Sequence, residues 1–164
     1  MGKNKPALKK SVKSAMKAWN VRPTRLQYGA LCYRTTRKGK VRVMLITSRR
    51  TRRWISPKGW PIKSLSPAAT AAREAWEEAG VRGEVAKRSI GFYPYQKYLG
   101  RGRTVTCLVQ VFPLRVTHRA ERFPEAEQRK IRWFKPKKAA KLVREPELAQ
   151  LIRNLPDLLA GSKD

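Results

Sequence analysis

Three glutamates within five residues are the feature of this chain that could do chemistry. Glu74, Glu77 and Glu78 are three and four residues apart, so a helix would place their side chains on one face. Like charges at this spacing repel, and Arg73, four residues before Glu77, would offset only part of the negative charge. Mg²⁺ commonly binds one or two carboxylates together with substrate phosphates. The spacing would therefore allow a Mg²⁺ or Mn²⁺ site, although it does not by itself favour one. The alternative is a solvated helix face whose acids pair with surface lysines.

The residues around the glutamates predict the helix that must carry them. Ser66 and Pro67 provide a hydroxyl cap and a proline at the first helical position. The segment Ala68 to Ala79 is rich in alanine and charged residues, which favour helix. Gly80 is a typical C-terminal stop. We therefore expect one helix that begins near Ser66 and ends at Gly80.

Apolar runs on both sides of this helix predict strands. The expected strands cover 27–34, 41–47, 54–56, 86–99, 104–117 and 131–134, with glycine-containing turns at 37–40 and 100–103 that form two hairpins. A loop over 58–65 leads into the helix. Further helices are expected at 137–143 and 146–159. Strands joined both by hairpins and by longer helical connections indicate an α/β layered domain with a mixed sheet.

Composition and charge narrow the class of protein. The chain has 164 residues, enough for one domain, and 39 Lys and Arg against 11 Asp and Glu give a formal net charge of +28. The first acidic residue is Glu74, so residues 1–73 hold 20 Lys and Arg and no acid. Such a half-chain should attract nucleic acid, polyphosphate, phosphorylated small molecules or anionic lipid. The alternative is a solvated cationic surface.

The same patterns suggest how the chain is divided. Residues 1–24 predict a basic, weakly ordered arm, and residues 25–160 predict one folded domain. No apolar run approaches the ~18 residues of a membrane-spanning helix, and no apolar core follows the N-terminal lysines as in a secretory signal. Cys32 and Cys107 lie in apolar stretches, which predicts buried thiols in a reducing compartment. We therefore expect a cytoplasmic protein.

The residues that flank the three glutamates resemble the Nudix box, Gly-x5-Glu-x7-Arg-Glu-U-x-Glu-Glu-x-Gly-U, in which U is apolar. Gly59 stands at its start, and 14 residues later follows the segment Arg73-Glu74-Ala75-Trp76-Glu77-Glu78-Ala79-Gly80-Val81. Leu65 replaces the first glutamate of the pattern. Three other segments resemble the diphosphoinositol polyphosphate phosphohydrolase-like branch of the family: Gln27-Tyr28-Gly29-Ala30-Leu31, Trp54-Ile55-Ser56-Pro57-Lys58-Gly59-Trp60-Pro61, and Glu127-Gln128-Arg129 ahead of Ile131-Arg132-Trp133-Phe134.

This resemblance implies a fold and an activity. The implied fold is an α/β/α sandwich around a mixed sheet. The implied enzyme hydrolyses a nucleoside or other organic diphosphate linked to a further moiety. On the matching positions, Glu74, Glu77 and Glu78 would carry the metals, and Arg73 would orient Glu77 or Glu74. The attacking water would be deprotonated by Glu77 or Glu78, or by an acid outside the box.

The surroundings of the box supply candidates for holding the substrate. The resemblance implies a further metal ligand from a backbone carbonyl near Lys58 and Gly59. Arginine and lysine side chains bind phosphoryl oxygens, and the cations that flank the box are Arg49, Arg50, Arg52, Arg53, Lys58 and Lys63. Arg53 and Lys58 are the preferred clamps. The alternative is that these charges belong to solvated loops.

Acids outside the box form a second group of candidates. Glu125 and Glu127 lie in a loop before a strand, where related enzymes can place an extra ligand or base, and Glu121 is a weaker candidate. Equally, these acids could balance neighbouring arginines at the surface. Leu65 can neither bind a metal nor accept a hydrogen bond, so we expect it to pack under the loop. Activity could then survive with an altered metal requirement, or be attenuated.

Two functions from different classes follow from these patterns. The first is a metal-dependent pyrophosphohydrolase that acts on a highly anionic substrate, such as a diphosphoinositol polyphosphate or a dinucleoside polyphosphate. The second is a Nudix-fold protein that binds RNA or another polyanion with little catalysis, suggested by the acid-free residues 1–73 and by Leu65. A weaker third interpretation treats residues 1–20 as an arm for anionic membrane or ribosome surfaces.

Overall fold

The structure is a computed structural model that describes residues 13–14, 17 and 25–161. The predicted basic arm over 1–24 lies outside the described residues except at those three positions. From Arg25 the elements are β1 (Arg25–Thr35), β2 (Val41–Thr47), β3 (Trp54–Ile55), β4 (Lys58–Gly59), α2 (Pro67–Ala79), β5 (Val81–Val85), β6 (Gly91–Gly100), β7 (Arg103–Arg119), β8 (Ile131–Phe134), α3 (Pro136–Leu142) and α4 (Pro146–Gly161). No helix in this part of the chain is long and apolar enough to cross a bilayer.

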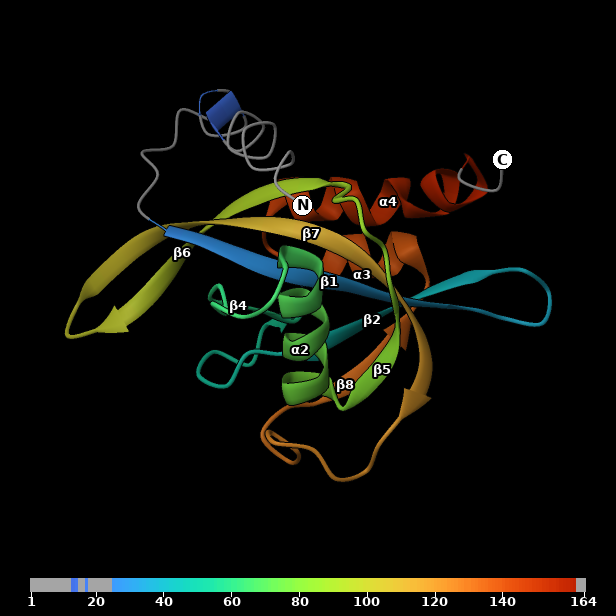
Figure 1. Ribbon diagram of the computed structural model, residues 1–164, viewed down its shortest axis with the longest axis horizontal. Coiled ribbons are helices and arrows are strands. Elements are labelled where there is room, and N and C mark those ends of the chain that lie inside the picture. The colour runs from blue at the N-terminus through green and yellow to red at the C-terminus, as the bar shows by residue number, and fades with distance from the viewer. Residues whose placement is uncertain (1–12, 15–16, 18–24, 162–164) are drawn as a thin grey trace.

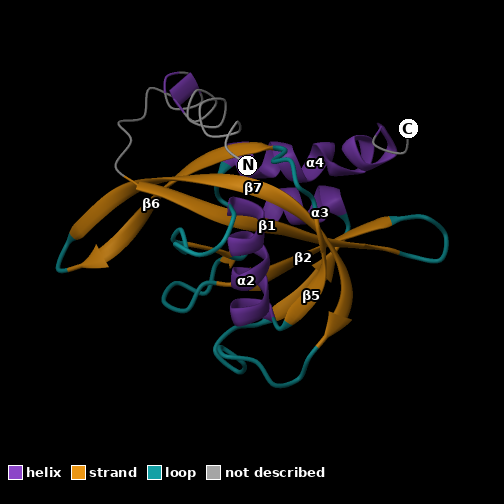
Figure 2. Ribbon diagram, viewed as in Figure 1, coloured by secondary structure: helices purple, strands orange, loops and turns teal. Residues whose placement is uncertain are grey.

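One mixed sheet organises the described residues (Figure 2). It has eight strands, and the central path runs β3-β2-β1-β7-β5. β1 and β7 pair in parallel over nine positions, from Arg25 opposite Cys107 to Tyr33 opposite Arg115. The other pairings between named strands are antiparallel. β6 and β7 form a long hairpin whose tip projects well beyond the sheet (Figure 1).

Helix α2 covers one face of this sheet. Ala71, Ala75 and Ala79 recur every four residues along α2 and are fully inaccessible to solvent. They pack in one cluster with strand residues that include Met44 and Ile46 of β2. Because alanine is small, the helix lies close to the strands beneath it. This contact turns the acidic face of α2 towards β4, so that Glu74 lies over Gly59 and Glu78 accepts from the backbone of Lys58.

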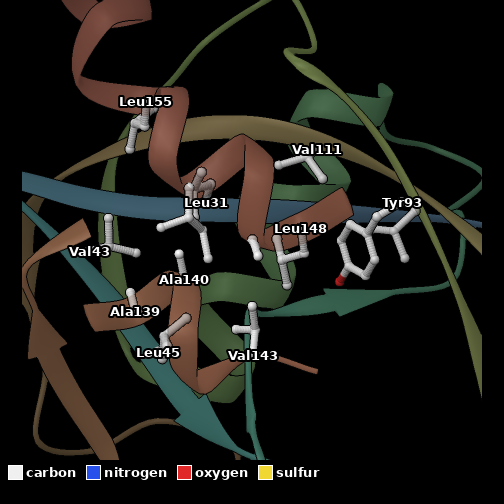
Figure 3. Packing of buried hydrophobic residues seen from close by; sticks show 13 residues of the cluster. Leu31, Val43, Leu45, Tyr93, Val111, Ala139, Ala140, Val143, Leu148 and Leu155 are labelled. Atoms are coloured by element: carbon white, nitrogen blue, oxygen red, sulfur yellow. The ribbon is translucent and has the colours of Figure 1, made fainter. Parts of the chain in front are cut away.

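Helices α3 and α4 cover the opposite face. Leu148 and Leu155 of α4 pack in one cluster with Leu31 of β1 and with Val43 and Leu45 of β2 (Figure 3). The sheet is therefore a central layer between α2 on one side and α3 with α4 on the other. This arrangement confirms the predicted α/β sandwich with a mixed sheet.

Local signals at both ends of α2 behave as expected. The backbone N–H of Ala69 donates to Oγ of Ser66, at 3.1 Å, and Pro67 occupies the first turn. Gly80 ends the helix with a left-handed φ of 66° and donates its N–H to the carbonyl of Trp76. A Cβ at Gly80 would also lie 2.3 Å from the ring of Phe123, so both conformation and space require glycine here.

Two strands differ from the expectation. A single strand is predicted over 86–99, whereas the structure has β5 at Val81–Val85 and starts β6 at Gly91. Gly83 and Glu84 disfavour strand, and β5 forms because β7 offers it a partner. The predicted loop over 58–65 contains β4, which pairs with Tyr28 and Gly29 of β1. Neither pairing has a local signal in the sequence.

Removing the cap of α2 should destabilise the domain. Ser66→Ala leaves an N–H of the first turn without its hydroxyl acceptor, which should lower the free energy of unfolding by about 1 kcal/mol. Ser64→Ala, at an exposed position two residues earlier, is the matched control and should change it by less than about 0.5 kcal/mol. Urea unfolding followed by circular dichroism measures both. Equal effects of the two variants would contradict the capping role.

Candidate active site

The three box glutamates lie on α2, the helix that packs against β4, and the pKa values of two of them are strongly raised. Glu78 is only 8% exposed, while Glu74 and Glu77 are half-buried. Burial, reinforced by Glu78 and Glu77, raises the pKa of Glu74 to about 7. Burial also raises the pKa of Glu78 to about 7, against the opposing effects of Arg129 and Lys58. The acids are thus crowded in a poorly solvated place, a setting in which a bound cation would stabilise their charged forms.

Strand β4 brings main-chain groups up to these acids. The backbone N–H of Lys58 donates to Oε2 of Glu78 at 3.4 Å. The carboxylate of Glu74 lies over Gly59 so closely that a Cβ there would stand 2.2 Å from its Cδ. On the other side of this segment, the N–H of Ala30 donates to the carbonyl of Pro57 at 2.9 Å. A side chain at position 59 would displace the Glu74 carboxylate, so the glycine at the start of the box allows this acid to lie against the main chain.

Glu125 is the acid outside the box that the fold brings to the site. Its backbone N–H donates to the carbonyl of Glu77 at 2.9 Å, and its charge raises the pKa of both Glu74 and Glu78. Arg129 connects these groups, with Nη2 at 3.1 Å from Oε1 of Glu125 and 3.6 Å from Oε1 of Glu78. Its Nη1 also donates to the carbonyl of Thr47 at 3.1 Å.

The guanidinium of Arg129 is almost fully buried, and sequence analysis did not assign it a role in the site. The spacing of Glu125 and Arg129 by four residues is a weak local signal for their pairing. Its contact with Glu78 has no such signal, because the two residues are far apart in the chain.

Two other predicted residues lie elsewhere. Glu127 is exposed, with a left-handed φ of 71°, and lines a separate hollow together with Glu121. Arg73 is exposed, and the ion pairs of the described residues do not include it. The expected pairing of Arg73 with Glu77 is thus absent from this structure, and Arg129 is the cation that reaches the box acids. An orienting role for Arg73 stays a prediction.

A cavity of about 470 Å³ adjoins the acids and is strongly basic. Glu78 and Lys58 line one part of it, and Tyr95, Gln96, Lys97 and Tyr98 of β6 line another. Seven Lys and Arg residues contribute to its wall: Arg49, Arg50, Arg53, Lys58, Lys97, Arg129 and Arg144. Burial lowers the pKa of Lys58 to about 8, and Glu78 opposes that shift. The cavity is therefore suited to a ligand with dense negative charge.

The predicted clamp residues divide into two groups. Arg50, Arg53 and Lys58 line the cavity, whereas Lys63 and Arg52 do not. Arg53 is already engaged, with Nη1 at 2.7 Å from Oε1 of the buried Glu145. Arg52 donates through Nη1 to the carbonyl of Gln128 at 3.0 Å. Leu65 is half-buried in the turn before α2 and also lies away from the cavity wall.

The donor set fits a hard divalent cation only if groups other than side chains contribute. Within the described ranges, no three His, Cys, Asp or Glu side chains converge closely enough to hold one ion. The acids around Glu78 are nevertheless all oxygen donors, and the main chain of β4 lies beside Glu74. Mg²⁺ commonly binds one or two carboxylates and completes its shell with water and phosphate oxygens. The crowded carboxylates meet that requirement.

Comparison with known proteins decides the family. The NUDIX domain model matches residues 25–155. The chain belongs to the Nudix family. Within this Nudix domain the matched segment contains the whole box, from Gly59 to Val81. Membership confirms the predicted class of enzyme, a Nudix hydrolase.

Several curated relatives carry names from one branch of the family. Human diphosphoinositol polyphosphate phosphohydrolase 3-alpha is 33% identical over 129 residues, which cover 76% of this chain and 74% of that protein. The mouse 3-beta protein matches to the same extent. Nudix hydrolase 12, mitochondrial, of Arabidopsis thaliana is 31% identical over 64% of this chain, and the match spans about half of its own length, 53%. These matches confirm the resemblance to this branch.

Solved Nudix structures share the fold. The binary complex of a C. elegans Ap4A hydrolase superimposes with a TM-score of 0.62 at 21% identity, covering 84% of this chain and 99% of that one. The NUDIX domain of Shewanella oneidensis NrtR, complexed with ADP ribose, gives 0.60 at 13% identity, covering 90% and 98%. At such low identity the likeness concerns the fold alone.

Replacing the buried acid should change how the stability of the Nudix domain depends on pH. Glu78 has an ordinary pKa of 4.5 and a pKa of about 7 when folded, so the folded state binds the extra proton between these values. The stabilisation is therefore complete below pH 4.5 and is lost as the pH rises through 7. In a chelator, Glu78→Gln should gain stability relative to the wild type across this window, as measured by urea unfolding.

A matched control is Glu84→Gln, which removes an exposed acid on β5. Its stability relative to the wild type should not follow the same trend. A difference between wild type and Glu78→Gln that stays constant from about pH 5 to about pH 8 would show that Glu78 is not the titrating group.

Proposed function

We propose that this Nudix protein hydrolyses a phosphoanhydride bond in a highly anionic substrate, with Mg²⁺ or Mn²⁺ bound at the acids of α2. One observation carries the proposal: Glu78, one of the crowded carboxylates, lines a cavity to whose wall seven Lys and Arg residues contribute. Glu78 and Lys58 line that cavity together. A carboxylate-bound cation and a basic wall are the two features that a phosphoanhydride substrate needs, because its own negative charge repels nucleophiles.

The roles proposed for individual residues follow from their positions. Glu74, Glu77 and Glu78 would share the binding of metal, one or two carboxylates to each ion, with a backbone carbonyl near Lys58 and Gly59, water and phosphate oxygens as further ligands. A divalent ion bound there supplies charge neutralisation and lowers the pKa of a bound water. Proton abstraction from the attacking water falls to a box glutamate, Glu77 or Glu78, or to Glu125, which the fold brings beside them.

The cations next to the acids have distinct proposed tasks. Lys58 lines the cavity and, with a pKa lowered to about 8, still carries a proton over most of its population at neutral pH. It would bind a phosphoryl oxygen of the substrate. Arg129 holds Glu125 and Glu78 in place through its two ion pairs and is therefore a positioning residue. Arg53 contributes charge to the wall while Glu145 fixes its direction.

Diphosphoinositol polyphosphates and dinucleoside polyphosphates are the substrates proposed first. The relatives named diphosphoinositol polyphosphate phosphohydrolase support the former, and the basic cavity suits either, since both carry many phosphates. The second candidate function, RNA or polyanion binding with little catalysis, rests on the charge of the chain. The two are separable, because hydrolysis should vanish with a chelator, whereas polyanion binding should weaken steeply with salt.

Glu77→Gln should abolish most turnover while leaving the fold intact. A screen of diphosphate-containing compounds with Mg²⁺ and Mn²⁺, followed by released phosphate or monophosphate, first identifies a substrate. On that substrate, loss of one metal-binding carboxylate should reduce kcat by about 10²-fold or more. Glu84→Gln is the control and should retain activity. Wild-type turnover by Glu77→Gln would show that the acids of α2 do not perform the chemistry.

A further inference from the structure

The cations of the cavity wall are held in two different ways. Arg49, Arg53 and Arg129 each lie within 4.0 Å of a carboxylate, on Glu125, Glu145, and both Glu78 and Glu125 respectively. The other four, Arg50, Lys58, Lys97 and Arg144, take part in none of the ion pairs found in the described part of the chain. The wall therefore combines partly neutralised arginines with cations whose charge remains available to a ligand.

Three of these four cations lie over aromatic rings. The guanidinium carbon of Arg50 is 4.3 Å from the ring centroid of Tyr98. Nζ of Lys58 is 4.7 Å from the ring of Tyr95. Nζ of Lys97 is 5.6 Å from the ring of Trp60. A cation–π contact holds a charged group in place without neutralising it, so each ring positions a cation that can still bind phosphate.

The same contacts limit what else the rings can do. Each ring face that meets a cation is unavailable for stacking on a nucleobase. Trp60 also has the guanidinium carbon of Arg25 at 5.5 Å from its ring centroid. Gln27, which also lines the cavity, already accepts a hydrogen bond from the hydroxyl of Tyr95 at 2.6 Å. These three rings thus support cations, and each loses at least one face to that contact.

The cations also differ in their distance from the acids. Lys58 lies next to Glu78, as the hydrogen bond of its backbone shows. Arg50 lies over Tyr98, three residues further along β6 than the Tyr95 ring that supports Lys58. Three residues of strand span about 10 Å. Figure 1 shows that β6 runs outward here, towards the projecting hairpin tip. Arg50 therefore lies further out than Lys58. Lys97 contacts Trp60, which directly follows β4, and so lies with Lys58.

From these contacts we infer that Arg50, supported by Tyr98, forms an outer phosphate subsite that binds phosphates remote from the bond that is cut. The enzyme then selects substrates by the extent of their phosphorylation and not by a nucleobase. The inference rests on the proposed function for its link to a reaction. The subsite itself is a binding property that can be measured without catalysis.

Isothermal titration calorimetry in a chelator, at fixed ionic strength, tests the subsite. The probes are inorganic pyrophosphate and inorganic tetrapolyphosphate, of which only the longer can span both groups of cations. Arg50→Gln should weaken tetrapolyphosphate binding about tenfold and pyrophosphate binding less than about twofold, because a charge-assisted contact to the remote phosphates is lost. Lys97→Gln, which removes a cation on the side of Lys58, should weaken the binding of both probes.

Matched variants separate the effect of the position of Arg50 from the effect of the overall charge. Arg52→Gln removes the same charge from the same loop, outside the cavity wall, and should affect both probes by less than about twofold. Tyr98→Leu removes the supporting ring without changing charge and should weaken tetrapolyphosphate binding, whereas Tyr98→Phe, which keeps the ring, should bind like the wild type. Thermal melting of each variant confirms that the domain is folded.

Two results would overturn the inference. Equal weakening by Arg50→Gln and Arg52→Gln would mean that general charge attracts the longer probe. Adenosine 5′-tetraphosphate binding about tenfold tighter than tetrapolyphosphate would reveal a base pocket, since a base that stacks on an aromatic ring strengthens binding. The proposed function is tested separately. If the variants bind the probes as expected but the protein hydrolyses no compound, the subsite is supported and the enzyme activity is rejected.

Discussion

Carboxylates buried at the junction of α2 with the sheet impose the constraint on which the rest of the site depends. Glu78 is 8% exposed, and Glu74 fills the space over Gly59. Both have pKa values raised to about 7, chiefly by burial. Charged forms in such a place need partners. The protein supplies the backbone N–H of Lys58 and the guanidinium of Arg129, and a divalent cation would complete the compensation.

This requirement relates several parts of the fold that are remote in sequence. β4 is only two residues long, yet its pairing with β1 fixes the main chain beneath Glu74 and Glu78. The segment before β8 brings Glu125 and Arg129 across to the same acids. Arg129 is held in turn by the carbonyl of Thr47 at the end of β2. The acids of one helix are thus positioned by contacts from three other segments.

The cations of the cavity wall also need partners, as the buried acids do. The largely buried arginines Arg129 and Arg53 are paired with carboxylates, which reduces the cost of burying them. Cations towards the β6–β7 hairpin are supported by aromatic rings, which fixes their position and leaves their charge for a ligand. Only part of the net charge of +28 therefore lies on the cavity wall, where a ligand can bind it.

Local patterns in the sequence determined the acidic helix, its cap and its stop. They did so because the periodicity of a helix places Glu74, Glu77 and Glu78 on one face whatever surrounds them. The paired and unpaired roles of the arginines, the inclusion of Glu125 and the exclusion of Glu127 and Lys63 were decided only by tertiary structure. The distances between these side chains depend on how strands far apart in the chain pair, and the type of a single residue does not specify that pairing. The net charge was evident from composition, whereas only the fold decided which charged side chains line the cavity.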